Sequence, residues 1–347
     1  MNLSATHTYS VLRVVTMISA IRFKNFKALQ DTRLQLGWYN LIVGPNGSGK
    51  STLLAGLQLI SRQRQFQLRE VRTAGTDSEP TNTEIVVQWR NAIHSPPVNL
   101  WWLVKSTGME LSPKYGDVDV EDGFSELQRA MVFAFSEDAI AAPVQLQPQM
   151  KLSSNGGGLA GVLDRMRDES PEVFEQLNGE IARLLPEFDR ILFETPTPGA
   201  RGLMLRTREG KHAIRAVNLS QGVLLAIALL TLSYLPDPPS VVGLEEPDRG
   251  IHPRLYRDIQ DALYRLSYPG SFGIDRPPVQ VIVTTHSPFM LDLHKDHPEE
   301  IVIAEKTEHG SEFHRLSERP DLTELLEEVS LGEAWYSGIL GGVPATP

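Results

Sequence analysis

Residues 44 to 51 have the types and spacing that bind a phosphate chain. They read Gly-Pro-Asn-Gly-Ser-Gly-Lys-Ser and satisfy the pattern G-x-x-x-x-G-K-[ST]. Glycines at three positions let successive backbone N–H groups converge on a phosphate, and the start of a following helix attracts the anion. Lys50 would reach the β and γ phosphates of ATP, and the Ser51 hydroxyl would bind Mg²⁺. The candidate nucleotide-binding residues are Gly44, Asn46, Gly47, Ser48, Gly49, Lys50, Ser51 and Thr52.

Two adjacent carboxylates end an apolar run that begins at Val241. In a phosphate-loop protein this is the Walker B position, where the first carboxylate supports Mg²⁺ and the second activates or orients the attacking water. We therefore predict Glu245 as a metal ligand beside Ser51 and Glu246 as the catalytic base. A solvated strand end also carries such residues, and the phosphate loop favours the catalytic interpretation.

His286 follows a second apolar run, Val281 to Thr284. At a strand end beside the phosphate loop, its ring would donate a hydrogen bond to the γ-phosphate and sense whether ATP is intact. The predicted catalytic residues are thus Lys50, Glu246 and His286. The alternative for His286 is a turn histidine that caps Ser287.

A third motif, Leu219-Ser220-Gln221-Gly222, precedes an apolar helix that starts at Val223. Ser220 and the backbone N–H of Gly222 would form a second anion site at the helix start. Because the chain already has its own phosphate loop, we infer that this site faces the γ-phosphate bound by a neighbouring copy. A plain serine N-cap accounts for the residues equally well.

The elements that position these motifs alternate as in an α/β protein. Strands are expected at 18–26, 32–36, 39–43, 84–89, 99–105, 190–193, 202–206, 240–244 and 279–284. Helices are expected from Lys50, over 223–232 and over 255–266, and helical spacing also marks parts of 121–187. The predicted domains are an extension over 1–17, an ATPase lobe over 18–120, a mainly helical insertion over 121–187 and the completed lobe over 188–347.

Composition narrows the class of protein. The 347 residues carry a net charge of −10 and no cysteine, which excludes disulfides and thiolate metal sites and argues against bulk attraction to nucleic acid. The longest apolar stretch is about half of the ~20 residues that a bilayer crossing needs, so no membrane partner is expected. Residues 1 to 15 lack the apolar block of a secretory signal, and we predict a cytoplasmic protein.

Taken together, the four motifs resemble those of ABC-type ATPase heads. Within that group the likeness runs from about Ile18 to Gly341 and favours the OLD family and related AAA-family ATPases of prokaryotic defence. It rests on the phosphate loop, the Leu-Ser-Gln-Gly signature, Glu-Glu-Pro-Asp-Arg-Gly-Ile-His-Pro from Glu245, Thr285 to Pro288 and the segment Leu331 to Gly338. RecF and SMC heads share the phosphate loop and signature, usually with aspartate in place of Glu245.

The resemblance implies a fold and a dimer. The fold would be α/β, a P-loop NTPase of ABC-ATPase type with a mixed central sheet, flanking helices and a short helical insertion. Two copies would enclose Mg-ATP, with Ser220 and Gly222 of one chain reaching the site of the other. The sequence departs from transporter ATPases at Val223 and from Arg249 to Pro253, and Gln88 is the candidate for the Q-loop glutamine. Met17 resembles the usual start of the family, which makes Met1 or Met17 the start of the chain.

OLD nucleases carry a Toprim nuclease domain after the head, and the segment after His286 is too short to hold one. We therefore expect an ATP-driven homodimer that acts as a switch on a separate effector protein, a nuclease or toxin. The alternative is a RecF-like repair ATPase that binds DNA directly, and a transporter role is disfavoured.

Three charged or aromatic groups remain. A DNA-facing patch of Arg62, Arg64, Arg69 and Arg72 is possible, although a solvated helix with scattered arginines is favoured. Trp89, Trp101 and Trp102 fit strand cores better than base-stacking platforms. Acidic residues near the C-terminus are expected on a solvated helix face and not at a metal: Asp296, Glu299, Glu300, Glu324, Glu327 and Glu328.

Overall fold

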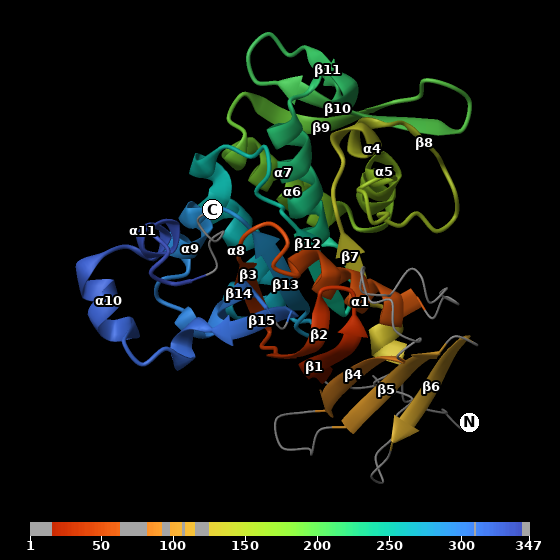
Figure 1. Cartoon of the computed structure of the whole chain (residues 1–347). Coiled ribbons are helices and arrows are strands. Elements are labelled where there is room, and N and C mark those ends of the chain that lie inside the picture. Colours follow the sequence, from red (N-terminus) through yellow and green to blue (C-terminus); the bar gives the residue numbers. More distant parts are fainter. Residues whose placement is uncertain are drawn as a thin grey trace, which may run out of the picture.

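The computed structural model describes residues 16–62, 82–91, 98–105, 108–114, 125–308 and 310–341. The strands of this part of the chain form three sheets, and the helices pack between and around them (Figure 1). No helix in this part is long and apolar enough to cross a membrane.

The central sheet has six strands in the order β15-β14-β3-β13-β12-β7. All neighbours are parallel except β14 and β15, so the sheet is mixed as predicted. Three of its strands, β3, β12 and β13, are near-continuous buried apolar runs, as expected of parallel strands that are covered on both faces. The strands are β3 (Tyr39–Val43), β7 (Met131–Phe133), β12 (Val241–Glu245), β13 (Gln280–Thr285), β14 (Ile301–Thr307) and β15 (Gly310–Arg315).

A five-stranded antiparallel sheet of order β2-β1-β4-β5-β6 covers helix α1 (Lys50–Arg62). Along β1, Ile21 and Phe23 are buried and Arg22 is exposed, the alternation of a strand with one face in the core, which confirms the strand predicted at 18–26. Phe23 belongs to one buried cluster with Leu54 of α1 and Ile282 of the central sheet, so α1 lies between the two sheets. The strands are β1 (Thr16–Phe26), β2 (Leu29–Gln35), β4 (Thr83–Asn91), β5 (Val98–Lys105) and β6 (Gly108–Lys114).

A third, smaller sheet packs with the helices of the middle of the chain. Its strands are β8 (Val144–Gln145), β9 (Phe188–Glu194), β10 (Ala200–Thr207) and β11 (Ala213–Arg215), with β10 pairing with all of the others. The helices nearby are α4 (Glu137–Ala141), α5 (Leu159–Glu169) and α6 (Pro171–Leu184). The range 121–187, predicted as a mainly helical insertion, thus includes α4, α5 and α6, and it also contributes β7 to the central sheet and β8 to the smaller one. A strand of three residues is too short for its periodicity to show in the sequence.

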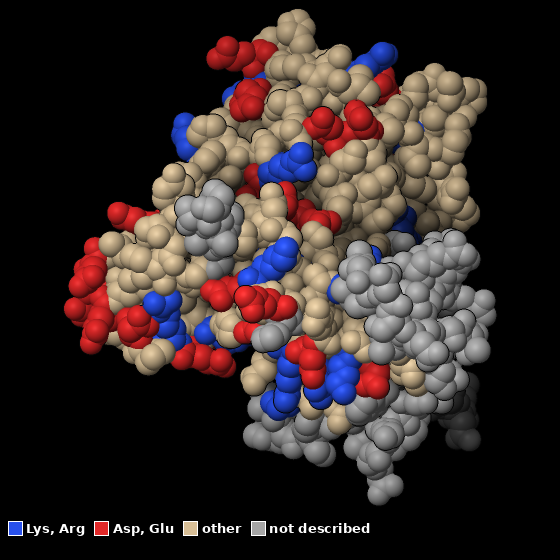
Figure 2. Space-filling model, in the orientation of Figure 1, with Lys and Arg blue, Asp and Glu red and all other residues tan. Residues whose placement is uncertain are grey.

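The remaining helices are α7 (Gln221–Tyr234), α8 (Tyr256–Ser267), α9 (Pro288–Leu293), α10 (Leu322–Glu328) and α11 (Leu331–Tyr336). Short 3₁₀ turns join them: η1 (Ala216–Asn218), η2 (Pro253–Leu255), η3 (Pro269–Phe272), η4 (Pro298–Glu300) and η5 (Leu316–Glu318). On the face shown in Figure 2, acidic side chains gather over α10, and basic and acidic ones alternate over β1 and β2.

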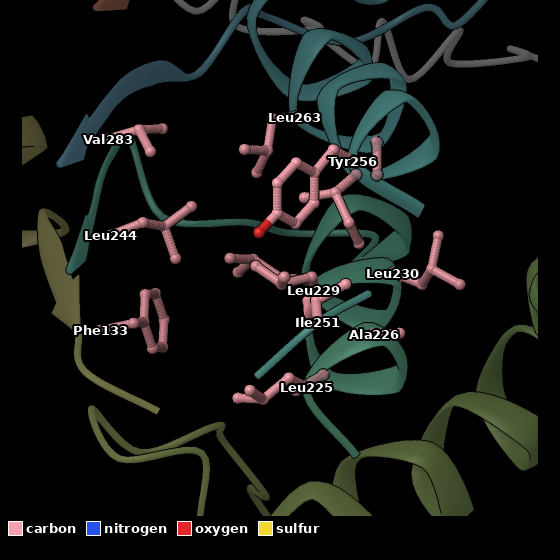
Figure 3. Close-up of a cluster of buried hydrophobic side chains, with 14 of the residues drawn as sticks. Phe133, Leu225, Ala226, Leu229, Leu230, Leu244, Ile251, Tyr256, Leu263 and Val283 are labelled. Atoms are coloured by element: carbon pink, nitrogen blue, oxygen red, sulfur yellow. The ribbon is translucent and has the colours of Figure 1, made fainter. Parts of the chain in front are cut away.

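Helix α7 is the centre of the larger core. It is apolar all round and buried from Leu224 to Ser233, the pattern of a helix enclosed on every side. Figure 3 shows Leu225 and Leu229 of this helix beside Phe133 and Leu244 of the central sheet. The helix that begins with the signature motif is therefore packed directly against the strand that ends in the two carboxylates.

Candidate nucleotide site

The phosphate loop joins β3 to α1 and needs its glycines. Gly47 and Gly49 have φ of 79° and 94°, a left-handed conformation that glycine adopts at little cost. A Cβ on Gly49 would lie 2.6 Å from the Ser311 Oγ, and one on Gly44 would lie 2.3 Å from the Ala304 carbonyl oxygen. The loop is thus pressed against β14 and β15, which hold its shape from behind.

Lys50 is folded back onto its own loop. Its side chain is buried, and Nζ donates hydrogen bonds to the carbonyl oxygens of Gly44 at 2.7 Å and Pro45 at 2.9 Å. Burial lowers the pKa of Lys50 to about 8, and the charges of Glu246 and Glu245 oppose this shift. Asn46 and Gly47 of the same loop are exposed.

Sheet order brings the other predicted residues to the same edge. Strand β13 lies between β3 and β12, with Thr285 opposite Val43 and Thr284 opposite Glu245. The carboxyl ends of these three parallel strands therefore meet, and ligands bind at this edge in open α/β sheets. Lys50, Glu245, Glu246 and His286 are gathered there.

Glu246 has an unusual backbone. Its φ is 44°, in the left-handed region that non-glycine residues seldom adopt, and such residues concentrate at functional sites. Its N–H donates to the Thr284 carbonyl oxygen at 3.0 Å, and its Oε1 lies 3.4 Å from the His286 Nε2.

The environment keeps His286 neutral near pH 7. Burial lowers its pKa, the charge of Lys50 lowers it further, and Glu246 acts in the opposite direction. A neutral imidazole both donates and accepts a hydrogen bond, which suits a group between a carboxylate and a phosphate oxygen.

The oxygen donors at the site fit Mg²⁺. Ser51 is exposed in the first turn of α1, and the half-buried Glu245 carboxylate ends β12. Mg²⁺ prefers oxygen ligands and is usually bound through one or two protein groups together with phosphates and water. Among the described residues, no group of three or more His, Asp or Glu side chains is placed to hold a metal.

The signature motif lies at the start of α7, where Gln221 lines a cavity together with Glu245 and Glu246. Ser220 is exposed at the N-cap of α7, and its side chain makes no capping hydrogen bond. A Cβ on Gly222 would lie 2.7 Å from the Gly250 carbonyl oxygen, so this helix start touches the loop after β12. Over the described residues, no hydrogen bond or ion pair joins Ser220 or Gly222 to residues 44–51.

The structure adds residues that the motifs did not reveal. A cavity of about 180 Å³ beside the carboxylates is lined by Ala134, Phe135, Gln221, Leu225, Glu245, Glu246, Pro247 and Arg249. Ala134 and Phe135 follow β7, the neighbour of β12, and no local signal marks that strand. Gln88, the Q-loop candidate, instead lies within β4, where it accepts a hydrogen bond from Arg33 at 3.2 Å.

The structure corrects the prediction for one acidic residue near the C-terminus. Glu300 was predicted on a solvated helix face, and this prediction is wrong. Its side chain is buried and accepts hydrogen bonds from Tyr264 at 2.5 Å and Tyr268 at 2.7 Å. The proposed arginine patch lies outside the described residues, apart from the backbone of Arg62 at the end of α1.

Comparison with known proteins agrees with this geometry. One family model, described as "AAA domain, putative AbiEii toxin, Type IV TA system", matches residues 145–292, and the "AAA ATPase domain" model matches 17–126. The Smc head domain of Pyrococcus yayanosii has the same fold, with a TM-score of 0.52 at 13% identity over 90% of this chain and 99% of that one. The chain is an AAA-type ATPase with the P-loop NTPase fold.

Two further proteins resemble the ATPase. The OLD nuclease of Thermus scotoductus is 23% identical over 329 residues, which cover 80% of this chain and 60% of the relative. The ATPase therefore spans less than two thirds of that protein. The recombination mediator protein RecF aligns with a TM-score of 0.46 at 13% identity, over 87% of this chain and 99% of that one.

Proposed function

We propose that the ATPase binds Mg-ATP, closes into a homodimer around it and acts as a molecular switch on a separate effector, a nuclease or toxin, in prokaryotic defence. The observation that carries the proposal is the division of the site. Lys50, Glu246 and His286 gather at the phosphate loop, while the exposed Ser220 at the N-cap of α7 makes no hydrogen bond to residues 44–51 within the described part of the chain. A second copy would complete the site by presenting that helix start to the γ-phosphate.

Hydrolysis would need no covalent intermediate. Backbone N–H groups of the loop and Lys50 would bind the phosphates, and Ser51 with Glu245 would hold Mg²⁺, which neutralises developing charge. Glu246 would orient the attacking water and accept its proton, with His286 donating to the γ-phosphate. Loss of that phosphate would remove the group that joins the two copies and so reopen the dimer.

The role in defence is supported by the descriptions of similar proteins. One matched family model refers to a toxin of a type IV toxin–antitoxin system, and the relative from Thermus is named a nuclease. An ATP-gated dimer changes the surface that it offers with the state of the nucleotide, which a toxin or nuclease partner could read.

The dimer is tested with Glu246→Gln. Removing the base while keeping the binding groups should trap ATP, so that light scattering finds about twice the monomer mass with Mg-ATP and the monomer mass with ADP. Lys50→Ala is the matched control and should stay monomeric because it loses the phosphate contact. A Glu246→Gln variant that stays monomeric with bound ATP would refute the nucleotide-bridged dimer.

The effector is sought with the same trapped variant. Tagged Glu246→Gln, recovered from its host with ATP, should retain one protein in a stoichiometric ratio, and Lys50→Ala should not. Nucleic acid without such a protein would instead favour the alternative, a RecF-like repair ATPase that binds DNA directly. In that case DNA should also raise the ATPase rate, and replacing Arg62, Arg64, Arg69 and Arg72 together should remove the effect.

A further inference from the structure

The loop from Glu246 to Gly250 is held at both ends. Glu245 ends β12, and Ile251 is buried against Leu225 and Leu229 of α7 (Figure 3). Within the loop, the Arg249 N–H donates to the Glu246 carbonyl oxygen and the Ile251 N–H donates to that of Asp248, both at 3.1 Å. These local bonds shape the loop but do not tie it to the turn that carries His286.

Asp248 supplies that tie. Its Oδ2 accepts a hydrogen bond from the Thr285 Oγ1 at 2.9 Å, and the same Thr285 oxygen accepts one from the Ser287 N–H at 2.9 Å. Thr285 and Ser287 flank His286 in the chain. The carboxylate of Asp248 thus joins the loop of Glu246 to the turn of His286 through one shared hydroxyl.

Asp248 is a costly residue at this place. It is 9% exposed, its Oδ1 is buried with no hydrogen-bond partner among the described residues, and burial raises its pKa. A buried carboxylate with so little compensation destabilises a fold. Such costs are tolerated mainly where the site needs the group.

The left-handed backbone of Glu246 explains why a buried carboxylate is kept at residue 248. A residue in this region persists only when surrounding bonds hold it there, and the Glu246 N–H to Thr284 bond is one such tie. The Asp248 to Thr285 bond is the next tie along the same pair of segments. These two hydrogen bonds hold the segments in which the Glu246 Oε1 lies 3.4 Å from the His286 Nε2.

We infer that Asp248 is a positioning residue, which sets the Glu246 and His286 side chains for hydrolysis through its hydrogen bond with Thr285. The inference rests on the roles proposed above for Glu246 and His286. The positioning role depends on the hydrogen bond itself, which needs an acceptor oxygen at residue 248 and a hydroxyl at residue 285.

The test separates turnover from binding in four single variants and one double variant. Asp248→Ala and Thr285→Val remove the bond and should each lower kcat roughly 10- to 100-fold, as small misplacements of catalytic groups do, with the Kd of a fluorescent ATP analogue changed less than about twofold. Asp248→Asn and Thr285→Ser keep the bond and should stay within about threefold of the parent rate. The double variant Asp248→Ala/Thr285→Val should be no slower than the slower single variant, because one shared bond is lost.

Three results would overturn the inference: parent-like kcat in Asp248→Ala, multiplied losses in the double variant, or a Kd that rises in step with the loss of kcat. Thr285→Val conserves volume, so it tests the bond even if Asp248→Ala fails to fold. Asp275→Ala, an exposed aspartate in the loop before β13, is the matched control and should leave the rate unchanged. Glu246→Gln is assayed alongside: if it hydrolyses ATP normally, the proposed base is wrong, whereas an inactive Glu246→Gln beside an active Asp248→Ala refutes only the positioning role.

Discussion

At the scale of single residues, the side chain of Lys50 is hydrogen-bonded to its own loop. The two carbonyl oxygens that accept from Lys50 belong to the first residues of the phosphate loop. The protonated ammonium of Lys50 is the form that would bind a phosphate oxygen, because a charge-assisted hydrogen bond is stronger than a neutral one.

The lowered pKa of Lys50 predicts how ATP affinity depends on pH. Below pH 8 the free protein carries a protonated Lys50, so affinity should be flat; above it, the free state loses the proton that binding requires and affinity should fall by up to about tenfold per pH unit. Titration of a fluorescent ATP analogue from pH 6.5 to 9.5 measures this. Lys50→Arg keeps its charge throughout and should bind with no slope above pH 8. An equally flat curve for the parent protein would contradict the prediction.

At the scale of elements, the start of α7 and the loop after β12 form one unit. Gly222 lies against the Gly250 carbonyl oxygen, and a Cβ on Gly250 would lie 2.7 Å from the Gln221 side chain. A movement of the signature end of α7 would therefore also move the loop that carries Glu246. That loop is followed by Ile251, which is buried in the core (Figure 3).

A methyl group at this contact should separate binding from dimer formation. Gly222→Ala places a Cβ 2.7 Å from backbone, so the helix start must shift. ATP binding to the monomer should change less than about twofold because residues 44–51 are untouched, while the ATP-bound dimer in a Glu246→Gln background should weaken about tenfold or more, as a lost backbone contact at an interface allows. Sedimentation at graded concentrations measures both species.

Gly179→Ala is the control for that experiment. Gly179 lies inside α6 with nothing within 4 Å of an added Cβ, so alanine should stabilise the fold by about 0.5–1 kcal/mol and leave the dimer intact. If Gly222→Ala dimerises as well as Gly179→Ala, the close contact has no part in assembly.

At the scale of the whole molecule, buried polar groups join parts that are distant in sequence. His294 is fully buried after α9, its Nδ1 lies 2.7 Å from the Met290 carbonyl oxygen, and its ring stacks on Tyr39 of β3 at 5.2 Å. The strand that leads into the phosphate loop is thus packed on the segment that follows the histidine turn.

This burial predicts an acid-sensitive fold. Burial lowers the pKa of His294 to about 4, against about 6.5 in an unfolded chain, so the unfolded state binds the extra proton between these values. The stabilising contribution is complete above pH 6.5 and is lost as pH falls toward 4, amounting to about 2 kcal/mol between pH 7 and 5. Urea unfolding at the two pH values measures it. His294→Gln should lose this difference in the free energy of unfolding between pH 7 and pH 5, whereas His314→Gln, which replaces an exposed histidine, should keep it. An equal difference in the two variants would contradict the role of His294.

The local chemistry of the site could be predicted from short stretches of sequence. A phosphate loop is one continuous turn between a strand and a helix, so Gly44 to Ser51 could be assigned from spacing, and the carboxylates at Glu245 could be placed because an apolar run ends there. The α/β alternation and most strands, β3 and β13 among them, followed from local periodicity, whereas the mixed central sheet was implied by the resemblance.

Which of these groups meet could not be read from local sequence and is set by the fold. The order of β3, β13 and β12 places Glu246 beside His286, and the fold seats Asp248 on Thr285 and Gly222 on Gly250. Strand β7 and the burial of Glu300 were likewise invisible in the sequence. The reason is physical: a motif is specified by neighbours along the chain, whereas these contacts arise from sheet order and packing, which depend on all segments of the core together.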